Sequence, residues 1–202
     1  MASLEKVSRQ YRGKMASGYD EKRLKQKRWH EENRIVEEML RSDIGGLPGR
    51  VIDCPVGTGR FLELYAKMSV SGVGIDSSEE MLAEARKKLG RKQKSYFLLG
   101  QGSADHMPSY EDGRFQTCVA VRFFNLLEPE ALKKCFAELS RVTSHHMICT
   151  VRLGPAYYSN SAMATHDEKA WWRMVRKHGW EVARDETEPF VKGWHLMLLR
   201  RT

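Results

Sequence analysis

The sequence predicts an α/β fold in which a doubly wound, mostly parallel seven-stranded sheet carries an N-terminal helical cap and a C-terminal antiparallel hairpin. Between residues 50 and 177, short apolar runs alternate with segments of helical period, the pattern of parallel strands joined by crossover helices. Two short apolar runs, roughly Trp180–Ala183 and Trp194–Arg200, end the chain and predict the hairpin. A turn with Gly57 and Gly59 follows the first strand, at the edge where open α/β sheets bind ligands.

Length and composition fit a single globular domain. The 202 residues are 41% hydrophobic and 30% charged, which is ordinary for one soluble domain. We expect residues 1–45 to form a basic arm and helix, and residues 46–202 to form the α/β core. No apolar run approaches the roughly 20 residues of a membrane span, and the N-terminus lacks the apolar segment of a secretory signal. The expected location is therefore cytoplasmic, with no membrane partner.

The cysteine pattern predicts free thiols and no metal site. The sequence has no Cys-x-x-Cys pair, and no histidine stands at metal-ligand spacing from a cysteine. Buried free thiols behave as small apolar side chains. The four cysteines, each inside an apolar segment, are Cys54, Cys118, Cys135 and Cys149.

The first part of the chain predicts a long helix and the first strand. Residues 20–41 have a helical period, and residues 42–49 form a loop because they contain three glycines and a proline. Residues 50–54 form the first strand, and the helix after the glycine turn extends to about Met68. The apolar face of the long helix comprises Ile35, Val36, Met39 and Leu40.

The next elements alternate as a parallel sheet requires. Gly72–Asp76 forms the second strand, which ends on an acid. Ser77, with Glu80 three residues later, has the spacing of a capping box and opens a helix. Ser95–Leu99 forms the third strand, and Gly102–Pro108 forms a loop at its far end.

Two more strand–helix units follow. Phe115–Val121 is apolar on both faces, as in a strand covered by helices, and Pro129 is well placed as the first residue of a helix. His146–Val151 forms the fifth strand. Thr165 with Glu168 has the spacing of a second capping box and predicts the start of the last helix.

The net charge of +8 is concentrated near the N-terminus. Residues 1–30 hold nine Lys/Arg and three Asp/Glu, an excess of six positive charges. A second basic segment, Arg86–Lys94, has six basic residues in nine. Each segment fits a phosphate-binding surface or a solvated one, and cations at a helix C-terminus are also favoured by its dipole. Binding of nucleic acid through residues 1–30 therefore stays open.

The glycine turn excludes two common nucleotide-binding motifs. A phosphate-binding P-loop requires Gly-Lys-Ser/Thr, whereas Gly59 is followed by Arg60 and Phe61. The dinucleotide fingerprint requires glycine or alanine three positions after Gly59, where this chain has Leu62. Leucine at that position obstructs the close packing of helix on strand that a small residue permits.

The turn instead resembles the first motif of class I S-adenosylmethionine-dependent methyltransferases, in the form Asp53-x-Pro55-x-Gly57-x-Gly59. Asp76 matches the acid that ends the second strand in that family, and Gly102–Pro108 resembles the loop after the third strand. The resemblance covers about residues 50–200. It implies a Rossmann-like methyltransferase fold, with S-adenosylmethionine as cofactor and S-adenosylhomocysteine as product.

Three positions depart from the family pattern. Pro55 replaces the first glycine of the motif and has no N–H to donate. Ser103 replaces an aspartate often set against the adenine amino group, so this contact passes to the Ser103 hydroxyl or to the backbone at Ala104. Gln116 stands where the family commonly has aspartate.

The resemblance also implies roles for individual residues. Asp53 anchors the methionine end of the cofactor, and Asp76 accepts hydrogen bonds from the ribose hydroxyls. Arg28 is placed like an arginine that binds the cofactor carboxylate in some relatives, and Tyr19 with Trp29 is a candidate aromatic lid. The expected cofactor-binding residues are Asp53, Pro55, Gly57, Gly59, Asp76, Ser77, Ser103, Ala104, Arg28 and Tyr19.

Residues for the methyl acceptor are expected at the carboxyl ends of the fourth and fifth strands. Arg122 and Arg152 in these positions favour a small anionic acceptor, such as a carboxylate or phosphate. Two alternatives stay open: methylation of RNA or another nucleic acid, and a cofactor-binding subunit without catalysis. The candidate acceptor residues are Arg122, Phe123, Asn125, Arg152, Tyr157 and His166.

Overall fold

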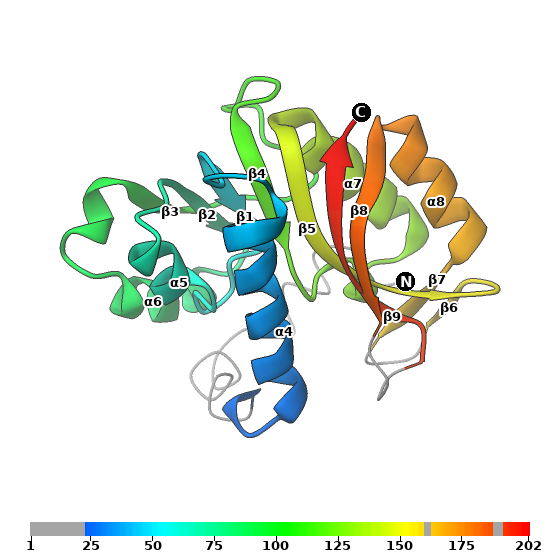
Figure 1. Cartoon of the computed structure of the whole chain (residues 1–202), viewed down its shortest axis with the longest axis horizontal. Coiled ribbons are helices and arrows are strands. Elements are labelled where there is room, and N and C mark those ends of the chain that lie inside the picture. Colours follow the sequence, from blue (N-terminus) through cyan, green and yellow to red (C-terminus); the bar gives the residue numbers. More distant parts are fainter. Residues whose placement is uncertain (1–22, 160–162, 188–191) are drawn as a thin grey trace.

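The structure is a computed structural model, and it describes residues 23–159, 163–187 and 192–202 (Figure 1). Its α-helices are α4 (Lys27–Glu38), α5 (Leu62–Lys67), α6 (Glu79–Lys88), α7 (Pro129–Val142) and α8 (Glu168–Lys177). Short π- or 3-10-helical turns are η1 (Met39–Asp43), η2 (Gln93–Ser95) and η3 (Phe124–Leu126). The strands are β1 (Val51–Asp53), β2 (Gly72–Asp76), β3 (Phe97–Gln101), β4 (Phe115–Ala120), β5 (Thr143–Gly154), β6 (Tyr158–Ser159), β7 (Ala164–Asp167), β8 (Trp180–Thr187) and β9 (Trp194–Arg201).

The sheet confirms the predicted doubly wound order and hairpin. Parallel strands run β3-β2-β1-β4-β5, and β9 pairs antiparallel with β5 and with the edge strand β8. Two short strands, β6 and β7, add to the predicted seven. They are added because β5 continues past its predicted end at Val151, and its last residues, Leu153 and Gly154, pair with β7.

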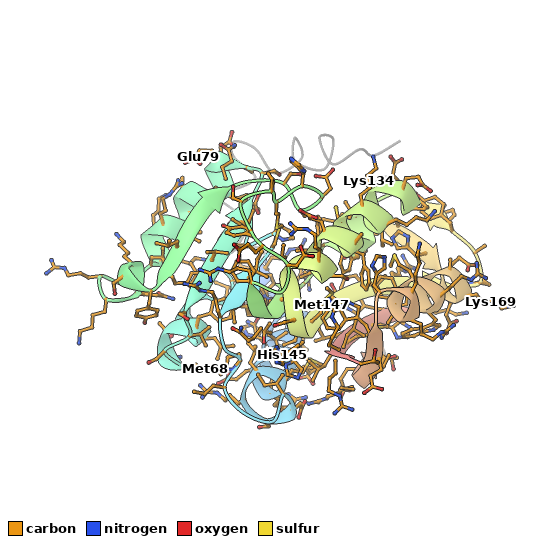
Figure 2. The ribbon with its side chains drawn as sticks, turned by 90° about the horizontal axis from the view of Figure 1, so that it is seen from above. Met68, Glu79, Lys134, His145, Met147 and Lys169 are labelled. Atoms are coloured by element: carbon orange, nitrogen blue, oxygen red, sulfur yellow. The ribbon has the colours of Figure 1, made fainter. Side chains whose placement is uncertain are left out.

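Alternation along the central strands produces two hydrophobic cores, one on each face of the sheet. On β5, Met147 and Cys149 pack with α7 and α8, whereas Ile148 packs with α4, α5 and α6. Figure 1 shows α4 in front of the sheet and α7 behind it. Seen from above, Met147 lies inside the molecule, and Lys134 of α7 and Lys169 of α8 lie at its outer surface (Figure 2). Both faces of the sheet are therefore covered, as the apolar strands require.

Both helix N-caps lie further along the chain than predicted, by one residue for α6 and by two for α8. The N-cap of α6 is Ser78, whose Oγ accepts a hydrogen bond from the Met81 N–H at 3.3 Å. The N-cap of α8 is Asp167, which accepts from the Ala170 N–H at 2.7 Å. Thr165 cannot cap this helix because it belongs to β7, where it pairs with Tyr158. Strand pairing thus overrides the local capping pattern.

The start of two elements also differs from the prediction. The third strand begins at Phe97 rather than Ser95, because η2 ends at Ser95 and places the buried Gln93 side chain against α5, where its Nε2 donates to the Leu62 carbonyl at 2.7 Å. α4 begins at Lys27, and residues 20–22 of the predicted long helix lie outside the described residues. In the part of the chain that the structure describes, no helix has both the length and the apolar character needed to cross a membrane.

Candidate functional site

A cleft opens at the carboxyl ends of β1, β2 and β4, at the lower edge of the sheet in Figure 1. Its volume is about 820 Å³, counting open solvent at the mouth. The cleft is mostly apolar, with a few charged groups, as such sites usually are. The described residues that line it are Trp29, Asp53, Pro55, Val56, Gly57, Thr58, Arg60, Phe61, Asp76, Ser77, Ser78, Met81, Val121, Arg122, Phe123 and Leu126.

Asp53 ends β1 at the floor of this cleft and is only 3% exposed. The Tyr65 hydroxyl donates to its Oδ2 at 3.1 Å, and the Tyr65 ring is held by stacking on Phe97, with 5.1 Å between ring centroids. Burial raises the pKa of Asp53 to about 8, although the Tyr65 hydrogen bond acts in the opposite direction. A buried carboxyl with this pKa is poised to ionise when a cation binds beside it.

Asp76 ends the neighbouring strand, β2, and connects the glycine turn to the start of α6. Its Oδ2 accepts from the Gly57 N–H at 2.9 Å, and its Oδ1 accepts from the Ser78 N–H at 2.9 Å. Burial raises the pKa of Asp76, and these backbone donors counteract the rise. Because a carboxylate has roughly four acceptor sites, Asp76 retains capacity for hydroxyl groups of a ligand.

The two glycines of the turn have different roles. Both have positive φ, 56° at Gly57 and 77° at Gly59, a backbone conformation that favours glycine. A Cβ at Gly59 would meet Leu62 Cδ1 at 2.4 Å, whereas one at Gly57 would meet nothing closer than Met81 Cε at 4.0 Å. The absence of a side chain at Gly59 thus makes room for Leu62. Helix α5 can therefore pack closely although Leu62 stands where the dinucleotide fingerprint has a small residue. Gly57 lines the cleft, whereas Gly59 does not and instead faces Leu62 and Ala85.

A buried carboxylate surrounded by arginines lies behind one wall of the cleft, and two of these arginines, Arg60 and Arg122, line that wall. Glu32, from α4, is 4% exposed and binds three guanidinium groups. The distances are 3.2 Å to Arg28 Nε, 2.9 Å to Arg60 Nη1 and 2.7 Å to Arg122 Nε. Burial by itself would raise the pKa of Glu32, but Arg122 and Arg60 outweigh it and hold that pKa below the usual range. The cluster joins α4 to the glycine turn and to the end of β4.

Trp29 completes this wall and joins the cluster to the cleft. The Arg60 guanidinium lies over the Trp29 ring, 3.7 Å from its centroid, and Arg60 Nη2 donates to the Trp29 carbonyl at 2.9 Å. Glu32 and Arg60 were not among the site residues predicted from the sequence. The i,i+4 spacing of Arg28 and Glu32 was the only local signal for the cluster, because the other two arginines are distant in sequence.

Several residues predicted to bind the cofactor lie elsewhere. Arg28 does not line the cleft; its guanidinium stacks on Trp194 at 3.7 Å from the ring centroid. Ala104 is buried in the core behind the sheet, and the Ser103 hydroxyl donates to the Asp105 carboxylate. Tyr19 lies outside the described residues. Within the described chain, the cleft contains Asp53, Pro55, Gly57, Asp76 and Ser77 from the predicted set.

The predicted acceptor residues divide into two groups. Arg122, at φ 59°, and Phe123 follow β4 and line the cleft. The other four gather near the carboxyl end of β5 and do not line the cleft. Of these, Asn125 is buried in η3, Tyr157 and His166 lie with ring centroids 5.8 Å apart, and Arg152 Nε donates to the Lys192 carbonyl at 3.3 Å.

His166 is part of β7 rather than of the helix start that the capping prediction implied. It is 5% exposed, and its Nε2 donates to the Phe124 carbonyl at 2.9 Å. Burial lowers the pKa of His166, so the ring is neutral at pH 7. Its hydrogen bond positions the turn after β4.

Comparison with known proteins gives the following similarities. Residues 51–146 match the family model described as a methyltransferase domain. A demethylmenaquinone methyltransferase of Renibacterium salmoninarum is 32% identical over 101 residues, which is 50% of this chain and 39% of that protein. The chain thus spans well under half the length of this relative.

Two solved structures share the fold across nearly the whole chain. Magnesium protoporphyrin IX methyltransferase from Synechocystis, with bound S-adenosylhomocysteine, has a TM-score of 0.70 and 14% identity, covering 98% of this chain and 100% of that one. The 1,6-didemethyltoxoflavin-N1-methyltransferase of Burkholderia thailandensis has a TM-score of 0.71 and 16% identity, covering 100% of this chain and 92% of that one. At these identities, the similarity establishes the fold, a Rossmann-like methyltransferase fold.

Proposed function

We propose that this chain is an S-adenosylmethionine-dependent methyltransferase that acts on a small acceptor and releases S-adenosylhomocysteine. One observation carries the proposal: Asp53 and Asp76 end adjacent parallel strands and flank the glycine turn within a single cleft. This segment lies inside the match to a methyltransferase domain. The similar structures include methyltransferases with S-adenosylhomocysteine bound, which supports the same cofactor here.

The residues of the cleft fit the chemical groups of this cofactor. Asp76 would accept hydrogen bonds from the ribose hydroxyls, and Asp53 would hold the ammonium group of the methionine end. Arg60 lines the cleft in the glycine turn and would bind the carboxylate, the role that the sequence analysis gave to Arg28. The cofactor supplies a methyl group on a positively charged sulfur, which transfers by in-line displacement.

The protein's contribution to such a reaction is alignment and exclusion of water. Trp29, Phe61 and Phe123 give the cleft aromatic walls, and Leu126 and Val121 extend the apolar lining. Holding two reactants in line within an apolar enclosure supplies much of the barrier reduction for a displacement.

The proposal is tested by comparing the stabilisation that different ligands confer. At 100 times its Kd, S-adenosylhomocysteine should stabilise the fold by about 2.7 kcal/mol, which raises Tm by roughly 5–10 °C for a chain of this length. The same assay on Asp76→Ala should show a much smaller shift, since the hydroxyl acceptor is removed. A shift with NAD and none with S-adenosylhomocysteine would contradict the proposal.

The charge of the cleft supports a small anionic acceptor. The Glu32 cluster has three guanidinium groups and one carboxylate, and Arg122 reaches the cleft beside Phe123. An acceptor carboxylate or phosphate would meet a surplus of positive charge at Arg122.

Comparing the two predicted arginines tests the acceptor class. Arg122→Gln should raise the acceptor KM about 10- to 100-fold, the range expected for loss of a charge-assisted hydrogen bond. Arg152→Gln, which lies outside the cleft, should change KM much less. The control is an unchanged Kd for S-adenosylhomocysteine in both variants. An equal KM for wild type and Arg122→Gln would exclude Arg122 as the anion-binding residue.

A further inference from the structure

A second cleft lies at the opposite edge of the sheet, where β1 and β4 begin. It has about the same volume as the first, 820 Å³ counting open solvent. Figure 2 looks onto this edge and labels Met68, which lines the cleft from the end of α5. Because β1 separates the two clefts, Arg50 and Asp53 lie about 10 Å apart along the strand. The lining residues are Leu47, Pro48, Gly49, Arg50, Met68, Ser69, Val70, Ser71, Arg114 and Gln116.

This cleft carries positive charge that the surrounding protein does not neutralise. Arg50 and Arg114 enter it from the residues just before β1 and β4. Among the described residues, neither the half-buried Arg50 nor the exposed Arg114 has a hydrogen-bond or ion-pair partner for its guanidinium. The described lining residues include no aspartate or glutamate. Two cations thus face one cavity without a counter-charge.

Gln116 lines the cleft, and the oxygen of its side-chain amide is already paired. Its Oε1 accepts the Arg50 N–H at 2.7 Å, which leaves the amide NH₂ to donate elsewhere. Gly49 permits this position: it has a φ of 65°, and a Cβ there would stand 2.7 Å from Gln116 Cβ. The hydroxyls of Ser69 and Ser71 line the same cavity. The polar side chains of the cleft therefore offer N–H and O–H groups and no carboxylate.

We infer that this cleft is a binding site for the phosphate group of a small organic ligand. Guanidinium groups bind phosphate oxygens in bidentate fashion, and a doubly charged oxyanion matches two unpaired arginines. Beside the arginines lie Leu47, 87% exposed, and the half-buried Met68, which offer an apolar surface to the organic part of the ligand. The inference is independent of the methyltransferase proposal, because the two clefts share no residue.

The test measures binding of phenyl phosphate and of inorganic phosphate to the full chain by isothermal titration calorimetry at constant ionic strength. Wild type should bind both, phenyl phosphate more tightly. Arg50→Gln and Arg114→Gln should each weaken binding by at least about tenfold, the loss expected for a charge-assisted hydrogen bond. Arg91→Gln, an exposed cation outside the cleft, is the matched control and should bind as wild type does.

Gln116→Glu is the sharpest variant because it alters charge at nearly constant shape. The new carboxylate can still accept the Arg50 N–H, so folding should be preserved, and thermal unfolding checks this. It would neutralise one arginine and should abolish phosphate binding, with an unchanged Kd for S-adenosylhomocysteine. Phosphate binding that survives Gln116→Glu, or that falls equally in Arg91→Gln, would overturn the inference. Binding of a single-stranded oligonucleotide at this cleft without binding of phenyl phosphate would also overturn it.

Discussion

Affinity for S-adenosylhomocysteine should rise nearly tenfold between pH 6 and pH 7 in the wild-type chain and should lose this dependence in Asp53→Asn. Burial holds the pKa of Asp53 at about 8, so the free protein carries it mostly protonated at pH 7. The proposed contact with the ligand ammonium requires the carboxylate. Each unit of pH below the pKa therefore lowers the ionised fraction, and with it the apparent affinity, about tenfold.

Titration calorimetry in two buffers of different ionisation enthalpy checks this result directly, since binding should release close to one proton. The matched variant is Tyr65→Phe, which removes the hydroxyl that donates to Asp53 at 3.1 Å. Because this bond lowers the pKa of Asp53, its loss should move the rise in affinity to higher pH. A flat profile in wild type would show that Asp53 does not bind the ammonium group.

The same shift has a consequence for stability, with a definite sign. The pKa of Asp53 rises from 3.8 to about 8 on folding, so between these values the native state holds a proton that the unfolded state has lost. The free energy of unfolding contributed by Asp53 must then fall as pH rises through this window. Asp53→Asn removes the penalty, and it should have a higher Tm than wild type at pH 8.5.

Glu32→Gln should be strongly destabilising, by about 3–5 kcal/mol, because it removes the carboxylate from a buried charge cluster. Arg60 and Arg122 have side chains only 9% and 11% exposed, and both lose their shared partner. For a chain of this length the loss corresponds to a Tm lower by roughly 6–20 °C. Urea unfolding of the ligand-free chain measures the change in the free energy of unfolding.

Glu31→Gln is the control for the Glu32 cluster. It lies on the same helix and pairs with Arg34, but its side chain is 57% exposed, so little change is expected. The contribution of Glu32 should also be lost in acid: its pKa is lowered on folding, so this stability is present above the unfolded pKa near 4.5 and disappears as pH falls through the folded value. Equal stabilities of the two glutamine variants would show that the cluster contributes nothing to the fold.

The order of elements and the two acids of the cleft could be predicted because both depend on local features. Apolar periods predicted the five parallel strands β3-β2-β1-β4-β5, and Asp53 and Asp76 followed because each ends a strand. In a parallel sheet, carboxyl ends of neighbouring strands meet at one edge, so two strand-end acids in sequence become neighbours in space. The glycine turn could be predicted for the same reason, because the positive φ of Gly57 and Gly59 depends on the residue type at each position.

Sequence patterns did not predict the N-cap residues of the helices, nor the position of Ser103, which was expected to contact the adenine of the cofactor. Thr165 has the spacing of a cap, yet pairing with β6 assigns it to a strand and passes the cap to Asp167. Ser103 matches a family position, yet its hydroxyl bonds to Asp105 and it does not line the cleft. For Thr165 the deciding partner is a strand outside the capping motif, and for Ser103 it is Asp105 of the same loop.

The α/β order, the hairpin and the positions of Asp53, Gly57 and Asp76 follow from the sequence alone, because short-range periods and turn chemistry encode them. The Glu32 cluster, in contrast, depends on tertiary packing. Glu32 meets Arg60 and Arg122 across separations of 28 and 90 residues, and no local pattern records these contacts. They form because α4 packs its apolar face on the sheet, which brings a buried carboxylate to two cations that need it.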